Sequence, residues 1–308
     1  MSGPGIPAGP ARLRSPEEIL EMEPEEADEL LDRLEAQVPM APSRLVDFPV
    51  APVEEAIVFG DTHGDWRSTV AAVELFGRDP NRRALVGLGD YLDRAPDDCA
   101  EGSVANALYL LQWVAEYPDR VVLIQGNHET TRRLPVLPMD TPEEVDALWG
   151  PEVDRYARLM GLLERGPLAA VSPSGAYLAH GGFPRAPTGV VAREAFRSPS
   201  DDTILDVVWG DCGASRSHRG VSVPFTEPEL LAFLHHLGAR IFLRGHDPDL
   251  VGRPVFHDRC LTLHTTRVYE RFGGVIVGRL PIGRRVETVR DVAIEHLPTE
   301  GRAFVPPH

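Results

Sequence analysis

The chain has 308 residues, of which 43% are hydrophobic and 25% charged, so it can bury the core of one large α/β domain. Its formal net charge of −16 argues against a nucleic-acid partner, because a phosphate backbone is also negative. All 31 basic residues are Arg, which excludes a catalytic Lys and a Lys-containing phosphate loop.

The cysteines and the apolar segments indicate where the protein works. Cys99, Cys212 and Cys260 are odd in number and lack metal-site spacing, which is typical of reduced thiols in the cytoplasm. No apolar run reaches the ~18 residues of a membrane span, and the N-terminus has no signal-peptide pattern. We therefore expect a cytoplasmic protein that has no membrane partner.

The first 55 residues predict a helical N-terminal segment. Residues 1–14 are rich in Gly, Pro and Ala, and we expect them to be disordered. Helices are predicted to start at Ser15-Pro16 and at Glu23-Pro24, the second continuing to Gln37. We interpret the acidic residues of 17–35 as a solvated helix face, with a docking site for a basic partner as the alternative. Residues 38–55 are Pro-rich and predict an irregular connector.

From residue 56 onward, short apolar runs alternate with helical patterns, which indicates βαβ units. The predicted strands are 56–59, 83–89, 121–124, 176–179 and 241–243, followed by β-rich segments at 260–265 and 274–280. The predicted helices are 66–77, 101–117, most of 142–165 and 227–237, while 203–208 is a short helix or a strand. This order predicts one α/β domain without an internal repeat.

Five of the predicted strands end in a polar turn that contains glycine. Glycine allows a tight turn and a close approach of the backbone, so polar side chains can converge there. Ligands bind at the carboxyl ends of the strands in open α/β sheets, so we expect these turns to form one site at one sheet edge. Their candidate ligands are Asp61, His63, Asp90, Asn127, His180 and His246.

These six side chains favour a metal site with two ions. A single zinc site needs only three or four protein ligands, whereas two Asp, three His and one Asn can hold two metals that share a carboxylate. The alternative is that each residue caps a turn or is a satisfied polar group of the core. Asp61 and His63 alone would fit that alternative, but five strand ends with the same chemistry favour metal binding.

Three of the turns resemble the signature motifs of the metallophosphoesterase superfamily. They are Gly60-Asp61-Thr62-His63-Gly64, Gly89-Asp90-Tyr91-Leu92-Asp93-Arg94 and Gly126-Asn127-His128-Glu129. Their order and spacing are similar to the phosphoprotein phosphatase (PPP) family of Ser/Thr phosphatases. The resemblance extends to later motifs of that family. The matching segments are His180-Gly181-Gly182, Arg219-Gly220-Val221-Ser222, Arg244-Gly245-His246 and residues 261–269, so the resemblance covers residues 25–280.

The resemblance implies a calcineurin-like metallophosphoesterase fold of the α/β class. This fold is a central β-sandwich of mixed sheets flanked by helices, with a dinuclear metal site at the C-terminal ends of the strands. We accordingly divide the chain into an N-terminal acidic helical arm with a Pro-rich connector (1–50), a catalytic domain (51–290) and a C-terminal tail (291–308).

The resemblance also assigns the ligands and the metals. Asp61, His63 and Asp90 would hold the first metal. Asp90, Asn127, His180 and His246 would hold the second, with Asp90 bridging the two ions. We expect two divalent metal ions, with manganese favoured in vitro and iron or zinc as alternatives, because the oxygen and nitrogen ligands suit all three.

The implied reaction is hydrolysis of a phosphomonoester on a phosphorylated protein by a metal-bridging hydroxide. His128 would be the general acid that protonates the leaving oxygen, and Asp93 would hydrogen-bond to it. Arg94 and Arg219 would bind the phosphate oxygens. Tyr269 would lie near the metal-bound water. His264 falls close to the site, and its role stays open.

The sequence departs from the family pattern at two places. Ala95 stands where the family usually has Gly, which would cause strain if that position needs a positive φ. The segment His264-Thr265-Thr266-Arg267-Val268-Tyr269 lacks the Ser-Ala-Pro-Asn-Tyr-Cys sequence of eukaryotic members, so regulatory subunits stay unknown. None of the cysteines lies in a Cys-x5-Arg loop, which disfavours a cysteine-phosphatase mechanism.

Two alternative functions remain open. One is a dinucleoside polyphosphate hydrolase of the diadenosine tetraphosphate type, which shares the three opening motifs; the segment starting at Arg219 argues against it. The other is a catalytically silent phospho-binding module, against which the intact ligand set and His128 argue.

Overall fold

The computed structural model describes residues 12–298 except 186–192, 216–220 and 223. Disorder was expected for residues 1–14, and residues 1–11 of this segment lie outside the described residues. The backbone N–H of Arg14 donates to Gln112 at 2.8 Å, so the chain is held against the domain from there. No helix in the described part of the chain is long and apolar enough to cross a membrane.

Two five-stranded sheets form the centre of the molecule. The β2 sheet has the order β10-β9-β2-β3-β4, and the β7 sheet has the order β1-β5-β6-β7-β8. The strands of the β2 sheet are β2 (Glu55–Phe59), β3 (Arg83–Gly87), β4 (Val121–Leu123), β9 (Ile276–Pro281) and β10 (Ala293–His296). Those of the β7 sheet are β1 (Leu45–Asp47), β5 (Ala169–Val171), β6 (Ala176–Ala179), β7 (Ile241–Arg244) and β8 (Cys260–Thr262).

Both sheets are mixed. Strands β2, β3 and β4 run parallel, joined by α3 (Trp66–Gly77) and α4 (Gly102–Glu116), so the predicted βαβ units are confirmed. Strand β9 pairs antiparallel with β2, and β5 pairs antiparallel with β6.

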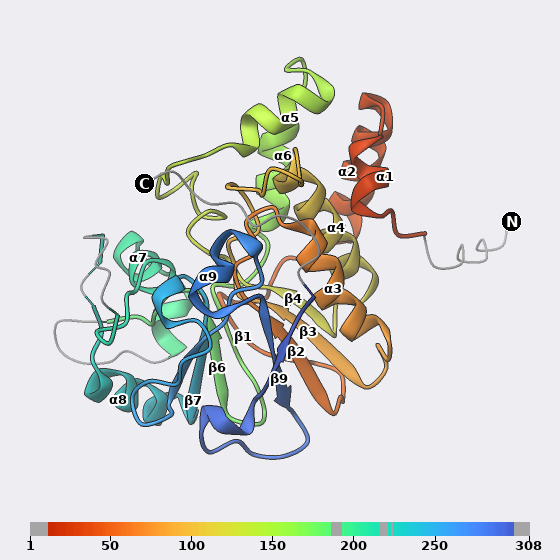
Figure 1. The fold of residues 1–308 in the computed structure, drawn as a ribbon. Helices are drawn as coiled ribbons and strands as arrows, with labels where there is room; N and C mark the ends of the chain where they lie inside the picture. The colour runs from red at the N-terminus through yellow and green to blue at the C-terminus, as the bar shows by residue number, and fades with distance from the viewer. Residues whose placement is uncertain (1–11, 186–192, 216–220, 223, 299–308) are drawn as a thin grey trace, which may run out of the picture.

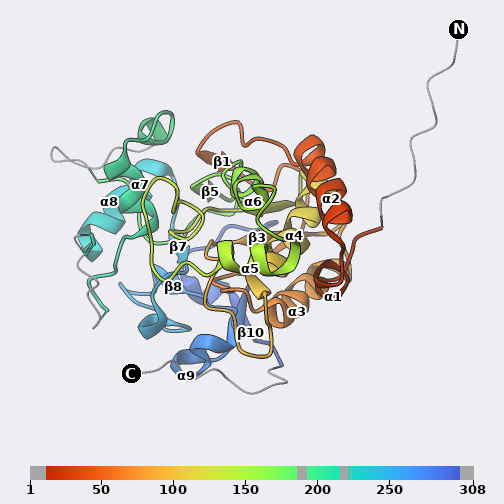
Figure 2. The same ribbon diagram turned by 90° about the horizontal axis from the view of Figure 1, so that it is seen from above.

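Alternate residues of the strands pack into different layers. In β2, Val58 belongs to the core between the sheets, whereas Ile57 faces the core under α3 and α4. Helices α7 (Asp201–Val208) and α8 (Glu227–Leu237) cover the outer face of the β7 sheet, on the opposite side from α3 and α4 (Figures 1 and 2). The predicted sandwich of mixed sheets flanked by helices is thus confirmed.

Several elements differ from the sequence prediction. The segment 38–55, predicted as an irregular connector, contains strand β1. Its first residue, Leu45, pairs with Ala169 of β5. The predicted tail contains β10, which pairs antiparallel with β9. Both strands are three or four residues long and depend on partners far away in the sequence, so no local pattern marks them. Segment 203–208, open between helix and strand, is helical within α7.

The segment predicted as mostly helical at 142–165 is two helices, α5 (Thr141–Trp149) and α6 (Arg155–Leu163), separated by a turn at Gly150. The short elements are α9 (Glu270–Gly273) and the 3₁₀ helices η1 (Arg193–Phe196), η2 (Pro248–Leu250), η3 (Arg267–Tyr269) and η4 (Val289–Asp291).

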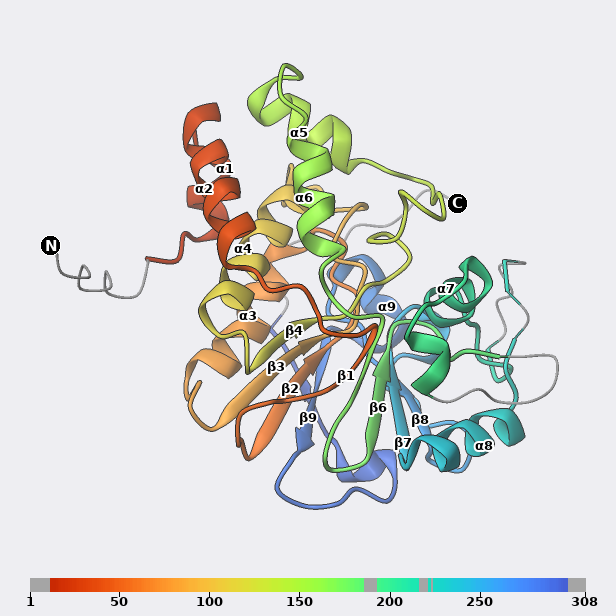
Figure 3. The same ribbon diagram turned by 180° about the vertical axis from the view of Figure 1, so that it is seen from behind.

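The N-terminal helices α1 (Pro16–Leu20) and α2 (Pro24–Gln37) pack beside α4 and α6 (Figure 3). Most of the acidic side chains between residues 17 and 35 are exposed, as the sequence predicted, but a few pair with basic residues of α6. Arg155 makes two hydrogen bonds to Asp28, at 2.8 and 3.0 Å, and Arg158 binds Glu35 at 2.8 Å. Part of the acidic face of α2 is thus paired with basic residues of α6 within the same chain.

Candidate metal centre

The predicted ligands converge between the two sheets rather than at the edge of one. Asp61 follows β2, Asp90 follows β3 and Asn127 follows β4, all in the β2 sheet. His180 follows β6 and His246 follows β7, in the β7 sheet. Each of the six predicted ligands is buried. The structure therefore brings together all of them, from five strand ends.

Asp90 lies at the middle of this group. Its Oδ2 is 3.4 Å from Nε2 of His180 and 3.7 Å from Nε2 of His63. Burial by itself raises the pKa of Asp90, but the imidazoles of His180 and His128 outweigh this effect, so the pKa lies well below its usual value. Asp90 is thus an ionised carboxylate shared by two sets of imidazoles, as a bridging ligand has to be.

One set of ligands lies around His63. Its Nε2 is 3.9 Å from Oδ2 of Asp61, and its Nδ1 lies 3.0 Å from the carbonyl oxygen of Leu92. The carbonyl accepts the Nδ1 hydrogen, so Nε2 presents its lone pair toward the carboxylates. Burial, together with the charge of Arg94, lowers the pKa of His63 to about 3, which keeps this imidazole neutral.

The second set lies around His180. Its Nε2 is 3.0 Å from Oδ1 of Asn127 and 3.1 Å from Nδ1 of His246, while its Nδ1 contacts the carbonyl oxygen of Leu88 at 2.9 Å. When Nδ1 of His180 donates its hydrogen to the carbonyl oxygen of Leu88, its Nε2 lone pair faces Asn127 and His246, an arrangement that a bound cation would satisfy. Oxygen and imidazole donors suit a divalent transition metal, so the residues present fit the expected ion. Asp90, His180 and His246 form one of two candidate ligand groups in the described residues, and His63, Asp90 and His128 form the other.

The backbone is shaped to make this convergence possible. His63, Asp90 and His246 themselves have positive φ angles of 46°, 57° and 71°, in the left-handed region that non-glycine residues rarely adopt. A Cβ at Gly60 would lie 1.7 Å from the carbonyl oxygen of Leu263, so this position requires glycine.

His128 and Asp93 form a buried pair next to the ligands. Nδ1 of His128 is 2.5 Å from Oδ2 of Asp93, while its Nε2 is 3.9 Å from Oδ2 of Asp90 and has no hydrogen-bond partner among the described residues. Burial lowers the pKa of His128, but the Asp90 and Asp93 carboxylates outweigh it, so the pKa is raised. This direction favours a proton donor at His128, which also lies within reach of the first set of ligands.

The other carboxylate oxygen of Asp93 is held by the start of α5. Oδ1 accepts hydrogen bonds from the backbone N–H of Asp140 and Thr141, at 2.8 and 3.0 Å, and from Oγ1 of Thr141 at 2.7 Å. These donors belong to the positive end of a helix, which stabilises the ionised carboxylate. Helix α5 therefore fixes Asp93 in the position from which it holds His128.

The predicted phosphate-binding residues are placed in part. Nη1 of Arg94 donates to the hydroxyl oxygen of Tyr269 at 2.9 Å, and the ring of Tyr269 lies 5.7 Å from that of His63. Arg219 lies outside the described residues. Arg94 has a positive φ of 61°, whereas Ala95 does not have a positive φ, so the strain considered for Ala95 does not arise.

Two buried carboxylates, one inside a signature motif and one directly after another motif, have structural roles that were not predicted. Glu129 accepts hydrogen bonds from the backbone N–H of Asp90, Tyr91 and Gly126, at 2.7, 2.9 and 2.8 Å, and so joins the turns after β3 and β4. Burial, together with the charge of Asp90, raises its pKa to about 7. Asp65 binds Arg267. The sequence could have indicated both residues by their position, because Glu129 lies inside a signature motif and Asp65 directly follows one.

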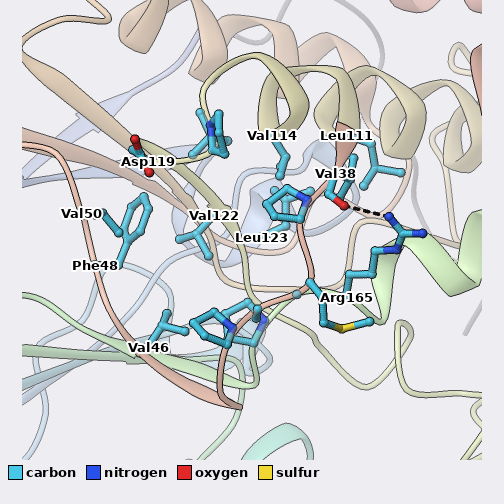
Figure 4. Close-up of a pocket in the computed structure, with 18 of the residues that line it drawn as sticks. Val38, Val46, Phe48, Val50, Leu111, Val114, Asp119, Val122, Leu123 and Arg165 are labelled. Carbon is cyan, nitrogen blue, oxygen red and sulfur yellow. Dashed lines mark hydrogen bonds between the residues drawn. The ribbon is translucent and has the colours of Figure 1, made fainter. Parts of the chain in front are cut away.

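An apolar groove of about 530 Å³ lies away from this centre, between β1, β4 and the ends of α4 and α6 (Figure 4). Its lining is mostly apolar, with Val46, Phe48 and Val122 among its side chains. The guanidinium of Arg165 at its rim donates to the carbonyl oxygen of Val38 at 2.7 Å. The groove includes none of the predicted site residues.

Comparisons with known proteins agree with this geometry. Residues 56–250 match the family of calcineurin-like phosphoesterases. The chain is 29% identical over 238 residues to human serine/threonine-protein phosphatase 5, covering 74% of this chain and 46% of that protein. It is 25% identical to a catalytic subunit of protein phosphatase 2A from Dictyostelium discoideum, covering 67% and 66% of the two chains.

The chain spans about half the length of the first curated relatives it matches. Among solved structures, a Saccharomyces cerevisiae protein serine/threonine phosphatase superposes with a TM-score of 0.71 at 18% identity, over 91% of both chains. At that identity the superposition supports the fold. The family match covers well over half of the chain and includes all six predicted ligands. The chain therefore belongs to the calcineurin-like phosphoesterase family.

Proposed function

We propose that the protein is a metal-dependent phosphoprotein Ser/Thr phosphatase that hydrolyses phosphomonoesters directly, without a phosphoenzyme. The observation that carries this proposal is the buried His128–Asp93 pair. Nε2 of His128 lies beside the shared carboxylate of Asp90 and has no hydrogen-bond partner in the described part of the chain. The curated relatives named above are Ser/Thr phosphatases, which supports the same reaction class.

In this proposal, two divalent ions occupy the two sets of ligands. Asp61, His63 and Asp90 would hold the first, and the second would be held by Asp90, Asn127, His180 and His246. Bound divalent metals supply Lewis acidity and lower the pKa of water, which provides a nucleophile near neutral pH. We propose manganese for activity in vitro, with iron and zinc as alternatives that the same donors accept.

The protein's own residues bind the phosphate and supply the proton. Arg94 and Arg219 would bind the phosphate oxygens, because a guanidinium offers paired donors to two oxygens. Tyr269 would orient Arg94 through the hydrogen bond between their side chains at 2.9 Å.

His128 would donate its Nε2 proton to the leaving oxygen of serine or threonine, which is a strong base once the ester bond breaks. Asp93 accepts the Nδ1 hydrogen and so stabilises the protonated imidazole. The Asp90 and Asp93 carboxylates raise the pKa of His128 despite its burial, which favours the protonated form. General-acid catalysis of this kind contributes ~10²–10⁴ in rate.

Phosphorylated proteins would be the substrates, and no observation assigns a regulatory subunit. We further propose a cytoplasmic location, which the three free and buried cysteines fit, because such thiols persist in a reducing compartment.

The test is phosphate release with Mn²⁺ from a phosphothreonine peptide, with a phosphotyrosine peptide and diadenosine tetraphosphate in parallel and His128→Asn as control. Turnover of the phosphothreonine peptide that the variant loses is expected. Turnover of diadenosine tetraphosphate alone would replace the proposal with nucleotide hydrolysis. No turnover with any metal, while the phosphopeptide still binds, would make the protein a phospho-binding module.

A further inference from the structure

His264 is a buried imidazole next to the metal ligands that the proposed reaction does not use. It follows β8, is 1% exposed, and its Nε2 lies 3.3 Å from Oδ2 of Asp61. The segment that begins with His264 departs from the sequence of eukaryotic PPP members, so the resemblance assigns His264 no role. Burying an imidazole costs free energy unless its polar atoms are used, which makes this contact informative.

The backbone places His264 beside Asp61 with little freedom. The two residues form a parallel bridge, in which the N–H of Thr265 donates to the carbonyl oxygen of Asp61 at 2.9 Å. On the other side, the N–H of Ile276 donates to the carbonyl oxygen of His264 at 2.9 Å. The missing Cβ of Gly60 allows the two segments to approach this closely. The side chain at position 264 must therefore lie along that of Asp61.

The carboxylate of Asp61 needs a second restraint to keep one orientation. The backbone N–H of His246 donates to Oδ1 at 2.9 Å and lies 3.2 Å from Oδ2, which holds one edge of the group. Oδ2 points toward Nε2 of His63, at 3.9 Å. A donor at Oδ2 that is not itself a ligand would stop the carboxylate from turning away from His63, and Nε2 of His264 lies 3.3 Å from this oxygen.

We propose that His264 is a positioning residue for the metal that Asp61 and His63 hold. The contact of 3.3 Å lacks hydrogen-bond geometry as it stands, so in its Nε2–H tautomer the ring would turn slightly to donate to Oδ2 of Asp61 and keep the carboxylate oriented toward His63. The inference rests on the metal centre of the proposed function. Partners of this kind, which bind a ligand rather than the metal, typically contribute about 10–100-fold to metal affinity.

The ring of His264 also contacts Tyr269, with the ring centroids 5.6 Å apart. Packing against Tyr269 depends on the shape of the ring, whereas the proposed role depends on the N–H donor. Two kinds of variant separate these roles. His264→Phe keeps a ring and removes the donor, while His264→Gln removes the ring and keeps an N–H donor at a similar distance from the backbone.

The experiment measures Mn²⁺ binding to chelator-stripped protein by calorimetry, for the wild type, His264→Phe, His264→Gln and the shorter His264→Asn. His236→Phe, on the exposed face of α8, is the control. We expect two sites in the wild type and in the control. His264→Phe and His264→Asn should weaken one site by about 10–100-fold, and His264→Gln should stay within a few-fold of the wild type.

The metal-free melting temperature shows whether each variant is folded, and His264→Asn serves in place of His264→Phe if the latter is not. Equal affinities for the wild type, for His264→Phe, which lacks the donor, and for His264→Asn, whose donor is too short to reach, would overturn the inference alone. Loss in His264→Gln as large as in His264→Phe would also overturn it, because ring packing or direct ligation would then be the role. A wild type that binds no metal would overturn the proposed metal centre and the inference with it.

Discussion

Asp65 and Arg267, which are 202 residues apart in the sequence, form a buried ion pair below the metal centre. Nη2 of Arg267 donates to Oδ1 of Asp65 at 2.8 Å, Nε to Oδ2 at 3.0 Å, and the backbone N–H of Arg267 to the same Oδ2 at 2.8 Å. Asp65 also caps α3 through the N–H of Ser68. The pair joins the turn that carries Asp61 and His63 to the loop that carries His264 and Tyr269.

Replacing Arg267 by Ala should lower the free energy of unfolding by about 3–5 kcal/mol, because Asp65 would keep a buried charge without its partner. Urea unfolding measures the change. Arg67→Ala is the matched control: Arg67 is half exposed and pairs loosely with Asp98 at 3.6 Å, so its loss should cost less than ~1 kcal/mol. Equal effects of the two changes would show that burial of the pair does not matter.

His128→Asn and Asp93→Asn should each lower kcat on a phosphothreonine peptide by about 10²–10⁴, since one removes the acid and the other its support. The double variant should be no slower than His128→Asn, because the two residues act as a unit. Steady-state kinetics at saturating Mn²⁺ measure this. Rate losses that multiply in the double variant would mean that Asp93 acts independently of His128.

Arg94→Ala should lower kcat/KM on the same peptide by about 10–100-fold, the worth of a charge-assisted hydrogen bond to phosphate. Arg94→Lys should recover only part of the loss, because an ammonium group lacks the paired donors. Tyr269→Phe removes just the hydrogen bond to Nη1 of Arg94 and should cost less than ~10-fold. An Arg94→Ala enzyme with unchanged kcat/KM would contradict phosphate binding by Arg94.

Glu144 gives the stability a defined pH dependence. Its carboxylate accepts from the N–H groups of Ser103 and Val104 at the start of α4, but burial raises its pKa from 4.5 to about 7. The folded state therefore binds the proton more tightly than the unfolded state. The contribution of Glu144 to the free energy of unfolding is fully present below pH 4.5 and is lost as the pH rises through about 7.

Glu144→Gln mimics the protonated carboxyl and should remove this pH dependence. Between about pH 5 and 7.5 the wild type should lose up to about 3 kcal/mol more unfolding free energy than the variant. Urea unfolding at both pH values measures the difference, with the exposed neighbour Glu143→Gln as control. Parallel curves for Glu144→Gln and the wild type would contradict the raised pKa.

Two glycines provide a matched pair for the close approach of the site segments. Gly60→Ala would put a Cβ 1.7 Å from a backbone oxygen, so it should destabilise the fold by about 3 kcal/mol or more. A Cβ at Gly161, in α6, meets no atom of the described residues within 4 Å, so Gly161→Ala should stabilise by about 0.5–1 kcal/mol. Thermal unfolding compares them, and equal melting temperatures would contradict the close contact between the segments after β2 and β8.

Much of the site could be predicted because its chemistry is local in the sequence. Each ligand directly follows an apolar run, and glycine beside it allows the turn, so the strand and its polar end can be recognised within a few residues. Strands β2, β3 and β4 were predicted in the same way, from their apolar runs, and α3 and α4 from the helical spacing of their apolar residues. The roles of Arg219 and of the metals remain predictions.

Strands β1 and β10 could not be predicted, since each is short and is stabilised by a partner strand from another part of the chain. The same holds for the pairing of Asp28 and Glu35 in α2 with Arg155 and Arg158 of α6. A local pattern shows that a side chain is charged, but it does not show which charge will face it.

The sequence by itself determined the donor set, the order of the motifs and the family, because these depend on residue types and short spacings. Only the tertiary structure decided that the ligands come from two sheets and that the start of α5 holds Asp93. It also decided that Arg267 pairs with Asp65 and that His264 lies against Asp61. These are contacts between segments brought together by burial of the core, and their geometry exists only once the sheets have packed.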